Sequence, residues 1–214
     1  MLMVNRFQFV SYLNDAFASD DSLAIALEND KNLIADSIKS GTSLTVAMFR
    51  YENTLYLYAE STKDNVCPSE LFPAVTDILD SSKWQLMNNV YYTSIPESLE
   101  YWARNEKKTR IGRIGKLLPD KIDSYIEYHI KFMEEGLFDG EKYLFISLKD
   151  NTLFLYSEDP GQMVHLNKDS NEESTVVHEW RKLNPKGHFD HEFSGEPNFV
   201  FLDEIFSLGR EDIF

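Results

Sequence analysis

The chain of 214 residues is poor in cysteine and has no long apolar run. Its single cysteine, Cys67, excludes a disulfide within the chain and is typical of a protein of the reducing cytoplasm. No stretch approaches the roughly 20 apolar residues that a membrane-spanning helix needs. Segment 1–15 has no basic stretch followed by an apolar one, so we expect no signal peptide. These absences predict a cytoplasmic protein with no membrane partner.

Basic residues are also scarce. Lys and Arg together number 21 against 36 Asp and Glu, which gives a formal net charge of −15. A nucleic-acid-binding face needs clustered Lys and Arg, so this charge balance predicts no nucleic-acid partner. The one local basic run, RNEKK at 104–108, is interpreted as a solvated linker. Hydrophobic residues make up 43% of the chain, which is enough for a substantial core.

One short sequence occurs twice. NTLYLYAES at 53–61 returns 98 residues later as NTLFLYSED at 151–159, with six of nine positions identical. A repeated strand predicts a repeated structural unit. Each copy is preceded by a second strand across a polar turn, which predicts a β-hairpin.

The elements that flank the two hairpins also match. Each half is predicted to contain a strand, a helix, the hairpin, a second helix and a final strand. In the first half the strands and helices outside the hairpin are expected at 6–13, 20–40, 71–84 and 88–95. In the second half they are expected at 110–118, 120–138, 174–183 and 197–208.

The sequence therefore predicts an α+β fold of two ferredoxin-like βαββαβ repeats, at 1–95 and 110–214, joined by a linker helix at 96–109. A ferredoxin-like sheet has one face covered by helices and one bare face. We expect the two antiparallel sheets to pack through their bare faces into one α/β barrel, an intrachain pseudo-dimer. The alternative is two separate domains in tandem. As a partner state we expect a monomer or a weak homo-oligomer.

Strand alternation sorts the side chains of the second copy. Leu153 and Leu155 share the face expected to pack against helices, whereas Phe154, Tyr156 and Glu158 share the other face. Rings combined with a carboxylate suit a polar, ring-shaped ligand such as a sugar. The alternative is a sheet–sheet interface with hydrogen-bonded tyrosines. We favour the interface for the first repeat and a ligand site for the second.

The helix of the second repeat carries a candidate acid. Tyr125 and His129 are four residues apart and lie on one helix face. Histidine exchanges protons near neutral pH, which suits general acid catalysis. The first repeat has Leu27 and Lys31 at the matching positions, so one pocket per chain is expected. An apolar stripe is expected to contact the sheet and to leave the Tyr125/His129 edge on a cleft: Ile122, Ile126, Ile130 and Met133.

Residues 110–208 resemble the L-rhamnose mutarotase family. The resemblance rests on Leu-Pro-Asp at 118–120, the Tyr125-x-x-x-His129 pair, NTLFLYSE, HEWRKL at 178–183 and FLDEIFSL at 201–208. Members of that family are small ferredoxin-like chains that dimerise through their sheets and interconvert sugar anomers without metal or cofactor. The resemblance implies that His129 is the proton donor and that the sugar is contacted by Tyr125, Tyr143 and Trp180.

Three departures from the family stand out. The helix that contains His129 is about a turn shorter, Arg181 stands where members usually have a second tryptophan, and an acidic loop occupies 166–175. The chain is interpreted as an aldose mutarotase-like isomerase acting on a small-molecule sugar, with His129 catalytic. Glu158 or Tyr156 is a candidate for the base from strand parity. The expected sugar-binding residues are Tyr125, Tyr143, Tyr156, Glu158, Trp180 and Arg181.

No cofactor and no metal is expected. His178, His188 and His191 lie at spacings that match no zinc signature and fall near loop-like segments. Two alternatives to the isomerase stay open. One is a non-catalytic member of the same barrel superfamily that binds a small ligand or a partner, and the other is a cofactor-independent monooxygenase.

Overall fold

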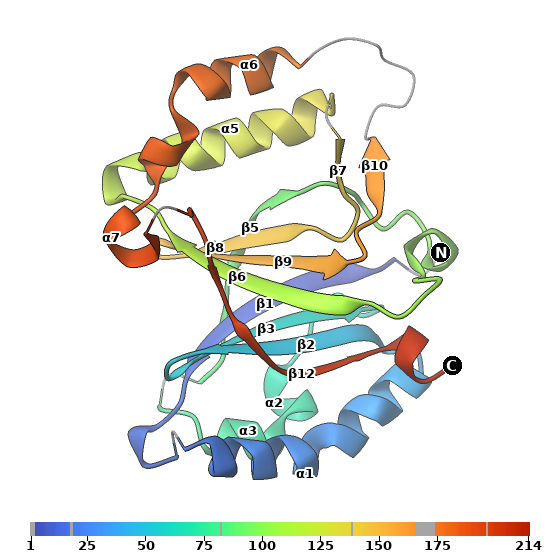
Figure 1. Ribbon diagram of the computed structural model, residues 1–214. Helices are drawn as coiled ribbons and strands as arrows, with labels where there is room; N and C mark the ends of the chain where they lie inside the picture. The colour runs from blue at the N-terminus through green and yellow to red at the C-terminus, as the bar shows by residue number, and fades with distance from the viewer. Residues whose placement is uncertain (1–2, 18, 82, 138, 166–173, 196) are drawn as a thin grey trace. The chain divides into compact units, whose positions relative to one another are not determined.

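The computed structural model describes residues 3–17, 19–81, 83–137, 139–165, 174–195 and 197–214 (Figure 1). The strands are β1 Asn5–Tyr12, β2 Ser43–Tyr51, β3 Thr54–Ser61, β4 Gln85–Leu86, β5 Asn88–Tyr92, β6 Thr109–Lys116, β7 Asp139–Glu141, β8 Phe145–Lys149, β9 Thr152–Asp159, β10 Met163–His165, β11 Val200–Phe201 and β12 Asp203–Gly209. The α-helices are α1 Asp20–Lys39, α2 Pro68–Leu71, α3 Pro73–Asp77, α4 Leu99–Trp102, α5 Ile122–Glu135, α6 Thr175–Lys182 and α7 His191–Ser194. The 3-10 turns are η1 Asp15–Phe17, η2 Pro119–Lys121, η3 Pro185–His188 and η4 Arg210–Asp212. Most of the acidic loop noted in the sequence, 166–173, lies outside the described residues.

The chain divides into two units, each with its own antiparallel five-stranded sheet. Unit 1 comprises 1–87, 96–110 and 203–214, and unit 2 comprises 88–95 and 111–202. The strand orders are β12-β2-β3-β1-β4 and β11-β6-β9-β8-β5. Four neighbouring strands of each sheet follow the ferredoxin-like order, which confirms the predicted α+β class with two ferredoxin-like repeats. Closure of the sheets into one barrel concerns the placement of the units and stays a prediction.

The fifth strand of each sheet comes from the other half of the chain. β5 pairs with β8 in unit 2, and β12 pairs with β2 in unit 1. The sequence-based boundary placed 88–95 in the first repeat and 197–208 in the second, so the assignments of β5 and of the β12 part of 197–208 are corrected. The short strands β4 and β11, which lie next to the exchanged strands in the sequence, pair within their own halves. Local strand signals do not specify which sheet a strand joins.

The repeat extends to backbone detail. The residues that turn the two hairpins, Glu52 and Asp150, both have positive φ, at 53° and 54°. The exchanged strands carry equivalent irregularities, between Asn89 and Tyr91 in one sheet and between Glu204 and Phe206 in the other. Matching register places Tyr91 of β5 and Phe206 of β12 at equivalent positions. The duplicated sequence thus folds as a duplicated backbone.

Helices cover the leucine-bearing face of each sheet, as the strand alternation predicts. In unit 1, Leu55 and Leu57 of β3 belong to a core with helices α1, α2 and α3, which line that sheet in Figure 1. In unit 2, Leu153 and Leu155 of β9 belong to a core with Tyr125 of α5. The aromatic and carboxylate rows therefore lie on the opposite faces of the sheets.

Two helix predictions need correction. The helix expected at 71–84 is only the short helix α3, preceded by the separate helix α2, because Pro73 lacks the amide hydrogen needed to continue α2 and instead begins α3. In α5 the buried residues are Tyr125, His129 and Phe132, whereas Ile130 is 42% exposed. The helix therefore buries its aromatic edge most deeply, while Ile122 and Ile126 also pack against the core and Ile130 lies outside it.

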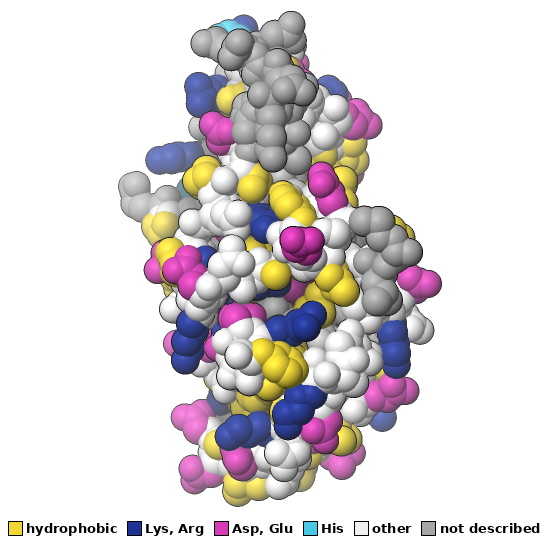
Figure 2. Space-filling model, turned by 90° about the vertical axis from the view of Figure 1, so that its right-hand side faces the viewer, with side chains coloured by type: hydrophobic (Ala, Val, Ile, Leu, Met, Phe, Trp, Pro, Cys, Tyr) yellow, Lys and Arg dark blue, Asp and Glu magenta, His cyan; other side chains and the backbone are white. Residues whose placement is uncertain are grey.

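No helix among the described residues is long and apolar enough to cross a membrane. On the face drawn in Figure 2, basic and acidic side chains are interspersed with hydrophobic ones, without a broad basic field. This arrangement agrees with the low content of Lys and Arg.

Candidate functional site

The predicted trio Tyr125, His129 and Trp180 does come together, inside the helix-covered core of unit 2. The His129 ring stacks on Tyr125 with ring centroids 3.9 Å apart and meets the ring of Trp180 edge-on at 5.5 Å. Tyr91 of β5 closes the other side at 5.0 Å. The trio forms because α6 lies on α5 and both helices project aromatic residues into the same space. It is an aromatic packing cluster rather than an open cleft.

The chemistry of His129 follows from that burial. Its side chain is only 8% exposed. Burial lowers the pKa of His129 to about 4, the hydrogen bond to the Tyr125 carbonyl partly opposes this, and His188 lowers it further. The Nδ1–H donates to that carbonyl at 2.7 Å. At neutral pH the ring is therefore neutral and already packed, which is a poor starting point for a general acid.

The candidate base lies on the other side of the sheet. Tyr156 and Glu158 alternate with Leu153 and Leu155 along β9, and those leucines belong to the core that contains Tyr125. The hydroxyl of Tyr156 donates to Glu158 Oε1 at 2.6 Å. Because the sheet separates the two groups, His129 and Glu158 cannot flank one sugar ring. The prediction of a single constellation in unit 2 is corrected on this point.

The two remaining predicted residues lie elsewhere in unit 2. Tyr143 precedes β8 and is fully buried, with its amide donating to Glu141 Oε1 at 3.1 Å and the Lys142 ammonium 5.2 Å from its ring. Arg181 is exposed on α6.

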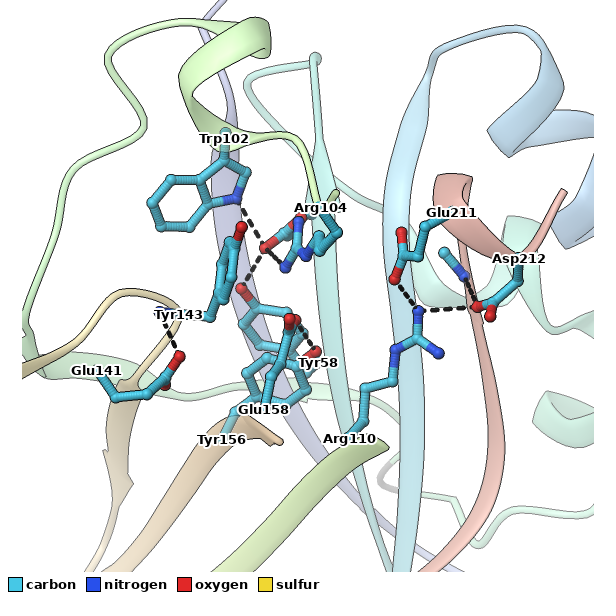
Figure 3. Close-up of polar contacts among 12 residues, drawn as sticks. Tyr58, Trp102, Arg104, Arg110, Glu141, Tyr143, Tyr156, Glu158, Glu211 and Asp212 are labelled. Carbon is cyan, nitrogen blue, oxygen red and sulfur yellow. Dashed lines mark hydrogen bonds and ion pairs between the residues drawn. The ribbon is translucent and has the colours of Figure 1, made fainter. Parts of the chain in front are cut away.

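A buried polar cluster in unit 1 surrounds Glu60 of β3. Its Oε1 accepts from the Tyr58 hydroxyl at 2.7 Å and from the Trp102 indole at 2.9 Å. The guanidinium of Arg104 spans both carboxylate oxygens, at 2.6 and 2.8 Å. Figure 3 shows Tyr58, Trp102 and Arg104 converging on this carboxylate. The guanidinium of Arg6 lies 5.0 Å from the Trp102 ring.

Electrostatics hold Glu60 in its charged form. Burial alone would raise the pKa of this carboxyl, but the charge and hydrogen bonds of Arg104, with those of Tyr58 and Trp102, bring it below the ordinary value. Burial raises the pKa of Tyr58, and the neighbouring Glu60 adds to this. The side chains of Glu60 and Arg104 are 0% and 3% exposed. The interpretation of Arg104 as part of a solvated linker is therefore wrong.

A cavity of about 410 Å³ adjoins this cluster within unit 1. Its lining includes Leu44, Leu99, Trp102, Arg104, Arg210 and Phe214. Helix α4 forms part of the cavity wall. Its N-terminus is capped by Ser98, whose hydroxyl accepts a hydrogen bond from the Tyr101 amide at 3.0 Å. The volume lies in the range of small-molecule sites, roughly 300–1,000 Å³.

The opposite wall is the C-terminal turn η4, which is held by Arg110. The Arg110 guanidinium pairs with Glu211 and, at 2.8 Å, with Asp212 (Figure 3). Asp212 also accepts from the Gly209 amide at 2.8 Å. Two independently anchored segments, α4 with Arg104 and the η4 turn, thus frame the cavity.

A second cavity of unit 1, of about 450 Å³, lies between α1 and β12. Its lining includes Leu23, Leu27, Lys31, Arg50, Ile205 and Phe206. Leu27 and Lys31 occupy the repeat positions of Tyr125 and His129. Beside the packed residues Leu27 and Phe206, unit 1 therefore keeps an unfilled groove where unit 2 has an aromatic cluster.

In the part of the chain that the structure describes, no group of three or more His, Cys, Asp or Glu side chains lies close enough together to hold a metal ion. Both ring nitrogens of His191 face backbone carbonyls, of Gly195 and Lys186. Ser124 and His188 are in hydrogen-bond contact at 2.9 Å.

Sequence reasoning missed the cluster around Glu60. The signal within reach was the conserved spacing of the internal repeat, because Tyr58-x-Glu60 and Tyr156-x-Glu158 form the same hydroxyl–carboxylate bond. The contribution of Trp102 and Arg104 had no such signal, since their segment lies outside the repeat and reaches Glu60 only through tertiary structure.

Comparisons with known proteins add little beyond this geometry. No family model matches the chain, and no curated protein matches it. Among solved structures, it is similar to one named "putative monooxygenase" from Lactobacillus acidophilus NCFM, with 8% identity, TM-score 0.45 and 96% of each chain covered. A second "putative monooxygenase", from Fusobacterium nucleatum subsp. nucleatum, has 10% identity and TM-score 0.47, covering 97% of this chain and 94% of that one. An anthrone oxidase-like protein has 8% identity and TM-score 0.39, covering 98% and 94%. Likenesses this distant carry no argument about activity.

Proposed function

We propose that this protein binds a small organic molecule without transforming it, and that the binding site is the cavity of about 410 Å³ in unit 1. The observation that carries the proposal is the position of this cavity beside Trp102 and Arg104, both immobilised by the buried carboxylate of Glu60. A pocket with apolar walls and a few fixed polar groups is the usual form of a small-molecule site. A binding site with flexible walls loses affinity because the walls must become ordered when the ligand binds. Trp102 and Arg104 avoid this cost because Glu60 already holds both side chains.

The expected acid and base of a sugar isomerase do not support catalysis in the same way. His129 is neutral and packed, and the sheet lies between it and Glu158. A binding protein needs neither group in a reactive state. This contrast favours the binding alternative over the isomerase.

The test is a thermal-shift screen of sugars, organic acids and small aromatic compounds, paired with a variant that fills the cavity. A ligand present at 100 times its Kd stabilises the folded state by about 2.7 kcal/mol. Ala103 lines the cavity and is exposed, so Ala103→Trp should block the site without disturbing the core. We expect stabilising ligands to lose their effect in this variant. Ligands that stabilise both proteins equally would place binding elsewhere and overturn the proposal.

A sugar mutarotase is the second candidate, favoured by the convergence of Tyr125, His129 and Trp180 that the family resemblance implies. Magnetisation transfer between the anomeric protons of L-rhamnose, with and without protein, measures this activity. An enzyme using His129 should lose about 10²–10⁴-fold of its rate in His129→Ala. The absence of any enhancement with the folded protein would remove this candidate. In either case we propose that the chain acts as a monomer or a weak homo-oligomer.

A further inference from the structure

Arg210 contributes a positive charge to the cavity of unit 1. It begins the η4 turn, is exposed, and places its guanidinium 5.8 Å from the ring of Phe214. Among the described residues, no carboxylate lies within ion-pair distance of it. Its charge is therefore available to a ligand.

The other cations at this site are already neutralised. Arg104 forms an ion pair with Glu60, and Arg110 forms ion pairs with Glu211 and Asp212. Glu211 lines the cavity but is held by Arg110. Glu100 also lines it, yet its carboxylate is exposed, where water and salt screen its repulsion.

The remaining walls are apolar. Leu44, Leu99 and Phe214 contribute aliphatic and aromatic surface, and Trp102 adds an indole whose nitrogen is turned away toward Glu60. A ligand that fills this space needs an apolar body, and it gains most if an anionic group reaches Arg210. Guanidinium groups bind oxyanions, such as carboxylates and phosphates, through paired hydrogen bonds.

We propose that the ligand is a small amphipathic anion, with an aromatic or alkyl body and a carboxylate or sulfonate head that contacts Arg210. This inference rests on the proposed binding function of the same cavity. It predicts selectivity for a charged probe over a neutral probe of the same shape.

Two fluorescent probes provide that pair. 8-Anilinonaphthalene-1-sulfonate and N-phenyl-1-naphthylamine share one ring system, and only the first carries an anionic group. We expect both probes to bind the wild-type protein at one site, and the sulfonate to bind about fivefold more tightly, the upper end of the range for one exposed charge contact. Binding of both probes should be lost in the Ala103→Trp variant.

Arg210→Ala should weaken binding of the sulfonate about fivefold and change binding of the neutral probe less than twofold. Arg210→Lys should recover part of the loss, and Lys39→Ala is the control for net charge, because Lys39 is exposed at the end of α1, outside the cavity lining. Circular dichroism spectra of all variants confirm folding. Equal binding of the two probes, or equal weakening of both by Arg210→Ala, would overturn the anion inference and leave the binding function standing. Failure of both probes to bind, or binding that survives Ala103→Trp, would overturn the binding function itself.

Discussion

The two units differ in how they fill the space between their long helix and the strand at the edge of the sheet. In unit 2, Tyr125 and His129 of α5 meet Tyr91 of β5, and rings fill the space between helix and strand. In unit 1 the equivalent residues Leu27 and Lys31 of α1 face β12 across a cavity of about 450 Å³. One backbone plan therefore yields a filled unit and a hollow one, depending on two helix positions.

The equivalent carboxylates Glu60 and Glu158 also differ between the two units, in the hydrogen bonds that they accept. Glu60 and Glu158 each accept a hydrogen bond from the tyrosine two residues earlier, at 2.7 and 2.6 Å. Glu60 also binds Trp102 and Arg104, which belong to the segment between the repeats. A segment outside the duplication thus gave unit 1 an anchored polar cluster and an adjacent cavity. One pocket per chain stays a prediction, and the geometry favours the first unit, not the second, as the binding unit.

The largest expected effect comes from removing the anchor of unit 1. Arg104→Ala leaves Glu60 buried without its guanidinium, which should lower the free energy of unfolding by about 3–5 kcal/mol. Urea denaturation followed by circular dichroism measures the loss. Lys107→Ala, at an exposed position of the same segment, should change stability by less than about 0.5 kcal/mol.

A double-mutant cycle tests whether the effect of Arg104→Ala depends on the charge of Glu60. In the Glu60→Gln background, Arg104→Ala should cost much less, because no buried charge is left unpaired. Equal losses in both backgrounds would show that Arg104 acts through packing alone.

Unit 2 should be the acid-sensitive unit. The pKa of His129 is about 4 in the folded state against 6.5 as its ordinary value, so between these values the unfolded chain binds more protons. Stability should therefore fall as pH falls from about 7 to 4, by about 3 kcal/mol. Glu60, whose pKa lies below its ordinary value of 4.5, loses its contribution only at lower pH.

Urea unfolding at several pH values tests this window. His129→Leu keeps an apolar side chain in the cluster and removes the titrating group, so most of the decline between pH 7 and 4 should disappear. A profile that is the same in wild type and variant would contradict the buried, neutral state of His129.

Exchanging matched residues between the units sharpens the comparison. Tyr125→Leu opens space in the packed cluster of unit 2 and should cost about 3 kcal/mol. Leu27→Tyr places a ring where unit 1 has a cavity and should cost less than about 1 kcal/mol. Thermal or urea denaturation compares the two, and equal costs would mean that the helix–strand gap of unit 1 cannot accept a ring.

Much of the fold was predictable because the signals are local. The internal repeat, the alternation of Leu153 and Leu155 with rings, and the hairpin turns all follow from sequence spacing. The exchange of β5 and β12 was not predictable, since two similar hairpins offer either strand a similar edge. The orientation of α5 was predicted only in part, because Ile122 and Ile126 do contact the core but the aromatic edge with Tyr125 is buried more deeply.

The candidate site was harder to predict for a related reason. The Tyr125/His129 pair resembles a catalytic motif, but its chemistry depends on burial, which its spacing does not reveal. Arg104 lies in a stretch that looks solvated, and only its contact with Glu60, 44 residues away, makes it part of a site.

The most direct test of unit 1 as the binding unit uses the three indole N–H signals of the protein, from Trp84, Trp102 and Trp180. Trp102 lines the proposed site, whereas Trp180 belongs to the aromatic cluster of unit 2. In a two-dimensional ¹H–¹⁵N spectrum, assigned with single Trp→Phe variants and titrated with 8-anilinonaphthalene-1-sulfonate, the Trp102 signal should shift with saturation while the Trp180 signal stays in place. A saturable shift of Trp180 with Trp102 unmoved would place the site in unit 2 and contradict the account.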